Sequence, residues 1–184
     1  MADNIAVVII AGEESPQLGT FKPLAVLKGK PLISWTLEIG FGISPDVYIL
    51  LKNREQESLL KETLSESSAK IIFEPRGDHT LPAALTQSLT KVPKDLIFLM
   101  GCNTPLLNSR LVLLLHEQIG SSSAAVPIWS NGNIEPFAAL YRRAPLPKTK
   151  ISSMQEFLDL MKVKYVKIEE LGIHPATFFK INSK

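Results

Sequence analysis

The sequence predicts a single α/β domain over residues 1–184, with three layers (α/β/α) around a mainly parallel sheet. Short apolar runs rich in β-branched residues stand at positions 5–10, 46–51 and 95–100, and such runs are typical of strands buried on both faces. Longer stretches with apolar residues at helical spacing separate them. Strands that alternate with helices form βαβ units with parallel strands. A chain of 184 residues suits one such domain and is short for two.

The first half of the chain is predicted to hold three strands. The apolar run at 5–10 ends in the small-residue turn Ala11-Gly12. Residues 31–39 are predicted as a helix with Pro31 in its first turn, and Gly40 and Gly42 are expected to end it. The next predicted elements are a strand at 46–51, a helix at 54–65 with Leu59, Leu60 and Leu64 on its inner face, a strand at 70–74 and a helix at 81–92.

The second half begins with the nearly uninterrupted apolar strand at 95–100. Ser109 is expected to cap the helix that follows, which runs to about Ile119. The remaining predicted elements are a strand at 124–129, a turn at 130–133, an extended segment at 135–142, a helix at 153–162, a strand at 165–169 and a short apolar tail at 178–182. In open parallel sheets ligands bind beyond the carboxyl ends of the strands, so the loops after the first four strands should form one crevice.

Composition excludes several functional classes. A net charge of +2 without an arginine-rich tract argues against nucleic acid or a membrane surface as partner. The one cysteine, Cys102, excludes an internal disulfide framework and a cysteine-only zinc site. No apolar run approaches the roughly 18 residues of a membrane-spanning helix. Asp3 before the first run, and Glu13 and Glu14 after it, are unlike a signal peptide, so the sequence predicts a cytoplasmic protein.

The stretch after the first predicted strand has the parts of a phosphate site. It combines the turn at Ala11-Gly12, a further glycine at Gly19 and a lysine at Lys22. Backbone N–H groups and a lysine ammonium group bind phosphate oxygens in such loops. The spacing does not match GxxxxGK[ST], which needs lysine directly after its second glycine. It does not match GxGxxG either, because position 14 is Glu14.

The segment from Ala11 to Lys22 resembles a third pattern, AGGxSxRMGxxK, with Glu13 at its second glycine and Gln17 at its arginine. That pattern opens the molybdenum cofactor guanylyltransferase (MobA-like) family of GT-A-type nucleotidyltransferases. Residues 134–143 resemble the family's QPLFALYR segment, and residues 178–183 resemble its F-x-N-I-N-T-P segment. The resemblance covers nearly the whole chain and implies a Rossmann-like nucleotidyltransferase fold.

The resemblance also implies a set of site residues. Lys22 falls at the lysine that binds nucleotide phosphate, and Asn103 falls at the CDxP aspartate that binds Mg²⁺. We therefore expect both to be catalytic. Acceptor binding is expected from Glu135, Pro136 and Arg142. The residues expected to bind nucleotide are Ile10, Ala11, Gly12, Glu13, Gln17, Gly19, Lys22, Asn53, Glu74 and Asn103.

Asn103 departs from the family in a way that bears on the metal. Mg²⁺ prefers anionic oxygen ligands, and an asparagine offers only a neutral carbonyl. The family's metal site is therefore weakened here, although substrate phosphates can still carry Mg²⁺. The alternative interpretation is that Asn103 only turns or caps the chain after its strand.

The function implied by the resemblance is transfer of GMP from GTP to molybdopterin cofactor, with release of pyrophosphate. GTP, the pterin and Mg²⁺ would be its small-molecule partners, and a protein partner in cofactor biosynthesis is possible. Glu13, Gln17 and Asn103 also allow a second interpretation, a non-catalytic member of the fold that binds nucleotide weakly or acts as a partner subunit. A third is a nucleotidyltransferase for another cofactor, with base choice set around Asn53 and residues 80–84.

Overall fold

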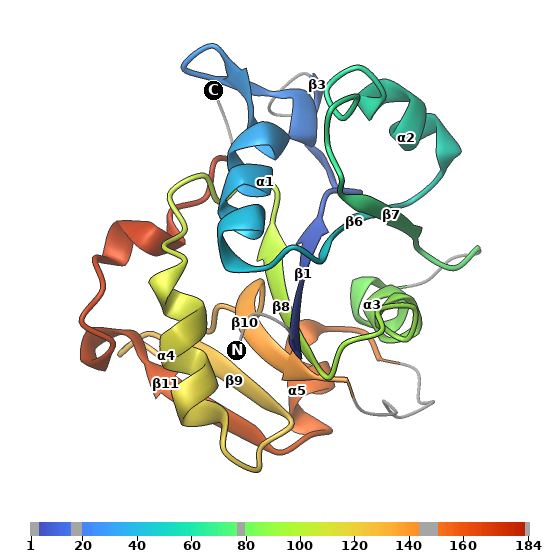
Figure 1. The fold of residues 1–184 in the computed structure, drawn as a ribbon. Coiled ribbons are helices and arrows are strands. Elements are labelled where there is room, and N and C mark those ends of the chain that lie inside the picture. The colour runs from blue at the N-terminus through green and yellow to red at the C-terminus, as the bar shows by residue number, and fades with distance from the viewer. Residues whose placement is uncertain (1–3, 16–19, 77–79, 144–150, 183–184) are drawn as a thin grey trace.

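The computed structural model describes residues 4–15, 20–76, 80–143 and 151–182 and has a seven-stranded sheet at its centre (Figure 1). The strand order is β11-β9-β10-β8-β1-β6-β7. The strands are β1 (Ile5–Ile10), β6 (Val47–Leu51), β7 (Lys70–Phe73), β8 (Leu96–Gly101), β9 (Ala124–Ile128), β10 (Ala138–Arg142) and β11 (Val163–Lys167). Two small antiparallel sheets pair β2 (Glu14–Ser15) with β3 (Thr20–Phe21) and β4 (Val26–Leu27) with β5 (Lys30–Pro31).

Helices cover both faces of the sheet, which confirms the predicted α/β class (Figure 1). They are α1 (Leu32–Ile43), α2 (Arg54–Leu60), α3 (Leu81–Leu89), α4 (Arg110–Ile119) and α5 (Met154–Asp159). Strand β1 shows how the two cores arise, because its side chains alternate between them. Val7 and Ile9 pack with the helices α1 and α4, whereas Val8 packs on the opposite face with α3 and α5. Within the described ranges, every helix is too short or too polar to span a lipid bilayer.

The sheet is mainly parallel, with one strand reversed. Strand β1 pairs in parallel with both β6 and β8, so the carboxyl ends of these strands meet at one edge. Strand β10 runs antiparallel to β8, with Ala138 opposite Met100 and Arg142 opposite Leu96. The start of β10, rather than its end, therefore lies beside the carboxyl end of β8.

Helix α1 is longer than the sequence predicted. Gly40 and Gly42 do not end it, and it continues to Ile43. A methyl group on Gly40 would touch Val7 and Val47, at 3.5 and 3.4 Å from their side-chain carbons. The glycine therefore lets the helix lie close to the sheet. That packing offsets the cost of a glycine in a helix, which is about 1 kcal/mol relative to alanine.

Three smaller predictions about helices were wrong. Leu59 is 51% exposed, because it lies one residue, or about 100° of helical rotation, from the buried Leu60. α2 ends there, short of the predicted position 65. Ser109 makes no side-chain cap, since its backbone is already helical. Asn108 caps the helix instead, because its side-chain oxygen accepts the Arg110 N–H at 2.9 Å.

Candidate active site

A pocket lies beyond the carboxyl ends of β1 and β8, where the fold class predicted a crevice. Ile10 and Gly101, the last residues of these strands, stand opposite each other in the ladder. The pocket is lined by Ile10, Glu13, Lys22, Gly101, Asn103, Thr104, Phe137, Lys180 and Asn182. Residues from the loop after β1, the turn after β8 and the C-terminal segment are thus brought together.

Lys22 forms an ion pair with Glu13 in this pocket. The Lys22 Nζ lies 2.9 Å from Oε2 of Glu13. Lys22 begins a short 3-10 helix, Lys22–Leu24, whose Pro23 is buried and which lies against α1. Only 10% of the lysine side chain is exposed, against 45% for Glu13. An incoming phosphate would therefore compete with the Glu13 carboxylate for the Lys22 ammonium group.

The loops after β1 and β6 are joined by a buried side chain, Gln56. Its amide donates to the Gly12 carbonyl at 3.1 Å and accepts the Lys52 N–H at 2.9 Å. A methyl group on Gly12 would lie 3.1 Å from Lys52 and 3.3 Å from Oε1 of Glu74, so glycine is needed for this close approach. Asn53 caps α2, with its side-chain oxygen accepting the Gln56 N–H at 3.0 Å.

These contacts locate the predicted nucleotide-binding residues. The Ala11 N–H donates to the Leu50 carbonyl at 3.0 Å and so belongs to the sheet. Asn53 and Glu74 lie at the β6 and β7 side of the edge and do not line the pocket. Gln17 and Gly19 lie outside the described residues.

Asn103 binds the C-terminal segment. Its side-chain amide donates to the Ile181 carbonyl at 3.3 Å and to Oδ1 of Asn182 at 2.8 Å, while the backbone carbonyl of Asn103 accepts the Ile181 N–H at 2.9 Å. Oδ1 of Asn103 folds back over Gly101, where an added methyl group would be only 2.7 Å away. Gly101 is thus required by the position of the Asn103 side chain.

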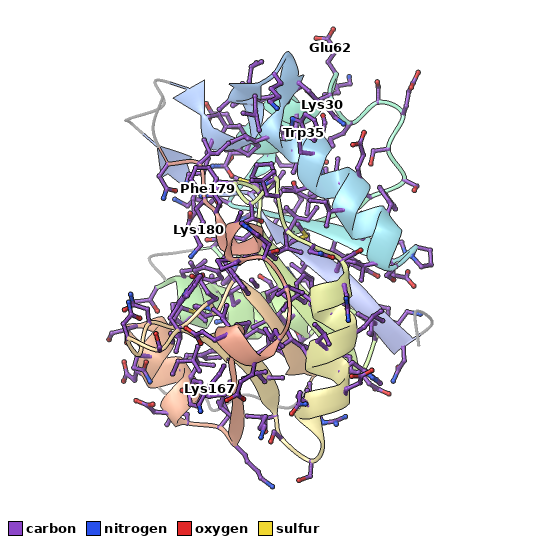
Figure 2. All side chains as sticks on the ribbon, turned by 90° about the vertical axis from the view of Figure 1, so that its left-hand side faces the viewer. Lys30, Trp35, Glu62, Lys167, Phe179 and Lys180 are labelled. Atoms are coloured by element: carbon purple, nitrogen blue, oxygen red, sulfur yellow. The ribbon has the colours of Figure 1, made fainter. Side chains whose placement is uncertain are left out.

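Lys180, which lies next to Phe179 in the same C-terminal segment (Figure 2), lines the pocket. Its Nζ lies 2.5 Å from Oε2 of Glu135, and the other carboxylate oxygen accepts the Trp129 indole N–H at 2.9 Å. The Trp129 ring also meets Phe178 edge to face, with ring centres 5.6 Å apart. Glu135 does not line the pocket, but its ion pair with Lys180 holds the lysine side chain in place.

The residues at the end of β8 do not fit a divalent cation held by the protein. The Ile181 carbonyl can only accept hydrogen bonds, so Asn103 must turn its NH₂ group toward it. Glu13, the carboxylate of the lining, already binds Lys22. Across the described residues, no group of three or more His, Cys, Asp or Glu side chains could hold a metal ion.

Two of the predicted acceptor residues have other roles in the structure. Arg142 lies at the opposite end of the sheet, because β10 is antiparallel, and its guanidinium donates to the carbonyls of Gly120 and Ser122. The expectation that it binds the acceptor is therefore not supported. The Pro136 carbonyl accepts the hydroxyl of Tyr141, whose pKa is raised by burial.

Cys102 is not a candidate nucleophile. Its side chain is fully buried, and desolvation raises the pKa of the thiol to about 12. The negative charge of Glu13 adds to this rise, while Lys22 opposes it. The thiol therefore stays protonated at neutral pH and acts as a small core residue.

Sequence reasoning missed the two pocket residues of the tail, Lys180 and Asn182. A signal was available, because residues 178–183 resemble a family motif. Lys180 stands where that motif has its first asparagine, and a charged residue at such a position marks a change in the site.

Comparison with known proteins gives a consistent result. A family model described as "MobA-like NTP transferase domain" matches residues 7–158. A probable molybdenum cofactor guanylyltransferase of Bacillus licheniformis is 29% identical over 187 residues, which cover 96% of this chain and 91% of the relative. A protein of the same description from Methanocaldococcus jannaschii is 28% identical, over 100% of this chain and 96% of the relative.

The fold also matches a solved structure. Molybdopterin-guanine dinucleotide biosynthesis protein A from Archaeoglobus fulgidus superposes with a TM-score of 0.77 at 20% identity, over 97% of this chain and 92% of that chain. At this identity the similarity shows a shared fold.

Proposed function

We propose, because the chain belongs to the MobA-like NTP transferase family, that it transfers the GMP group of GTP to molybdopterin cofactor and releases pyrophosphate. The observation that carries this proposal is the pocket at the carboxyl ends of β1 and β8, which brings together Lys22 and Lys180. Two ammonium groups at the end of a parallel sheet suit a phosphate chain. The names of the relatives from Bacillus licheniformis and Methanocaldococcus jannaschii favour GTP and the pterin as the substrates.

In the proposed reaction, a terminal phosphate oxygen of the pterin attacks the α-phosphorus of GTP. A new P–O bond forms there as the bond to the oxygen that bridges the α- and β-phosphates breaks, and pyrophosphate leaves with that oxygen. The chain contributes by positioning the reactants and neutralising their charge, and no covalent enzyme intermediate is needed. Lys22 would bind the phosphate chain after leaving Glu13, and backbone N–H groups of the loop after Ala11 would add hydrogen bonds.

Mg²⁺ enters the proposal only as an ion that the nucleotide itself can carry. Asn103 uses both amide hydrogens for the C-terminal segment and provides no anionic oxygen. The proposed reaction therefore uses no metal ion held by the protein at this position.

The first experiment is a calorimetric titration of the protein with GTP, CTP and ATP, each with Mg²⁺ and with EDTA. We expect micromolar binding with a preference for GTP. Pyrophosphate release on addition of molybdopterin would then test the transfer itself. Preference for CTP would favour the alternative of a nucleotidyltransferase that makes a cytidylylated cofactor.

A non-catalytic protein of this fold is the second candidate. The observation that favours it is the Glu13–Lys22 pair, which occupies the phosphate-binding lysine with a carboxylate. Such a protein would bind nucleotide weakly, release no pyrophosphate and serve as a partner subunit in cofactor biosynthesis. Binding of GTP without turnover, together with capture of a defined partner enzyme, would support it. We also propose a cytoplasmic location, which cell fractionation can check.

A further inference from the structure

The C-terminal segment supplies an ammonium group to the pocket as well as lining residues. Lys180 and Lys22 both line the pocket, together with one carboxylate, Glu13. The Lys180 side chain is 33% exposed, whereas the Glu135 carboxylate behind it is 10% exposed. A lysine ammonium group has three N–H donors. Lys180 can therefore keep its bond to Glu135 and offer a second one to a phosphate oxygen.

Asn103 determines where Lys180 lies. Three hydrogen bonds join Asn103 to Ile181 and Asn182, the two residues that follow Lys180. An aspartate at position 103 has no hydrogens to donate, so it would face the Ile181 carbonyl with a like partial charge. The amide is thus the group that this contact requires, and a metal-binding carboxylate at position 103 is incompatible with it.

The two arrangements differ in net charge. An aspartate with a bound divalent cation adds one net positive charge to a phosphate site. The Lys180–Glu135 pair adds no net charge, but its ammonium group lines the pocket and its carboxylate does not. Lys180 can therefore still attract a phosphate oxygen and donate a hydrogen bond to it.

We propose that Lys180, positioned by Asn103, binds the triphosphate of the nucleotide in place of a divalent cation held by the protein. The pocket then binds a nucleoside triphosphate through Lys22 and Lys180 without needing a metal ion. This inference rests on the proposed function, since it assumes that the pocket takes a nucleotide. Lys180 is a binding residue in this scheme, and Asn103 is a positioning residue.

The test is a titration with GTP, and separately with inorganic tripolyphosphate, in EDTA and in Mg²⁺. We expect the wild-type protein to bind GTP with similar affinity in both solutions. Lys180→Ala should weaken binding of both ligands in EDTA roughly tenfold to a hundredfold, as for loss of a charged hydrogen bond. Lys180→Arg should restore most of it. A loss for GTP without a loss for tripolyphosphate would overturn the assignment to the phosphate chain.

The variant Asn103→Asp tests the positioning role of Asn103. It should weaken GTP binding in EDTA by at least about fivefold. It should also speed hydrogen exchange at the Ile181 amide, and Mg²⁺ should not restore the affinity. Thermal melting of each variant separates a local effect from unfolding. Tighter Mg²⁺-dependent binding by Asn103→Asp would overturn the inference.

The matched control is Lys167→Ala. Lys167 also pairs with a glutamate, Glu170, at 3.1 Å, and it lies well away from Lys180 in Figure 2. Its loss should leave GTP affinity unchanged. Wild-type binding that requires Mg²⁺ would overturn the inference while leaving the proposed function intact. Absence of any nucleotide binding in both solutions would instead overturn the proposed function, and the inference with it.

Discussion

The loop after β1 and the C-terminal segment each bring a lysine to the pocket, but they hold it in opposite ways. Lys22 is the buried member of its pair and Glu13 is half-exposed, whereas in the second pair Glu135 is the buried member and Lys180 the more exposed. Trp129 also fixes the Glu135 carboxylate. A half-exposed carboxylate can turn into water at little cost, and a buried one cannot. The first pair can therefore open for a ligand, and the second is a fixed support.

The largest effect that would test this comparison is expected from Lys22→Ala. The substitution removes a buried ammonium group and leaves the Glu13 carboxylate facing the phosphate. GTP affinity should fall about tenfold to a hundredfold, measured by calorimetry. Lys30→Ala is the control, because Lys30 belongs to the same part of the chain but pairs with Glu38 outside the pocket. Equal affinities for the two variants would contradict the role of Lys22.

Glu135→Gln tests whether the Glu135 carboxylate is a fixed support for Lys180. Loss of the charge weakens the bond to Lys180, and the free energy of unfolding should fall by about 1–2 kcal/mol, since the lysine is partly exposed. Chemical denaturation measures this change. Glu170→Gln, which removes the charge from an exposed pair, should change stability by less than about 0.5 kcal/mol. If both substitutions had equal effects, Glu135 would not be a special support.

Glu13→Gln tests whether the first pair opens. Without the competing carboxylate, Lys22 is released more readily, and GTP affinity should rise about twofold to fivefold. Stability should change little, because Glu13 is half-exposed. Calorimetry and thermal melting on one preparation check both statements. Weaker GTP binding by this variant would show that Glu13 assists the ligand rather than competing with it.

The smallest effect on nucleotide binding is expected from Arg142→Ala, far from both pairs. The substitution removes hydrogen bonds to two backbone carbonyls, so stability should fall by about 1 kcal/mol. Nucleotide affinity and pyrophosphate release should stay as in the wild-type protein. A marked loss of turnover, with the melting temperature unchanged, would support the original prediction that Arg142 binds the acceptor.

The strands of the fold were predictable because their signal is local. The runs that became β1, β6 and β8 are apolar throughout, and burial on both faces leaves no other pattern. The end of α1 was less predictable, since Gly40 looks like a helix terminator until its contact with Val7 and Val47 is known. Ser44 marks the true end, with its hydroxyl donating to the Ile5 carbonyl at 2.6 Å.

The site was predictable on the β1 side and not on the side of the tail. Lys22 follows β1 within a recognisable motif, so its position in the pocket could be expected. Lys180 depends on contacts between Asn103 and residues that lie 78 and 79 positions later in the chain. The reversed direction of β10 is likewise a tertiary property, and without it Arg142 is placed at the wrong edge of the sheet.

The route of the C-terminal segment also determines when the pocket is completed during protein synthesis. The ribosome releases Lys22 long before Lys180, and a domain generally folds as a unit. The second lysine arrives only when residues 180–182 dock on Asn103. The pocket is therefore expected to be complete only after β11, the last described strand of the sheet, has been synthesised.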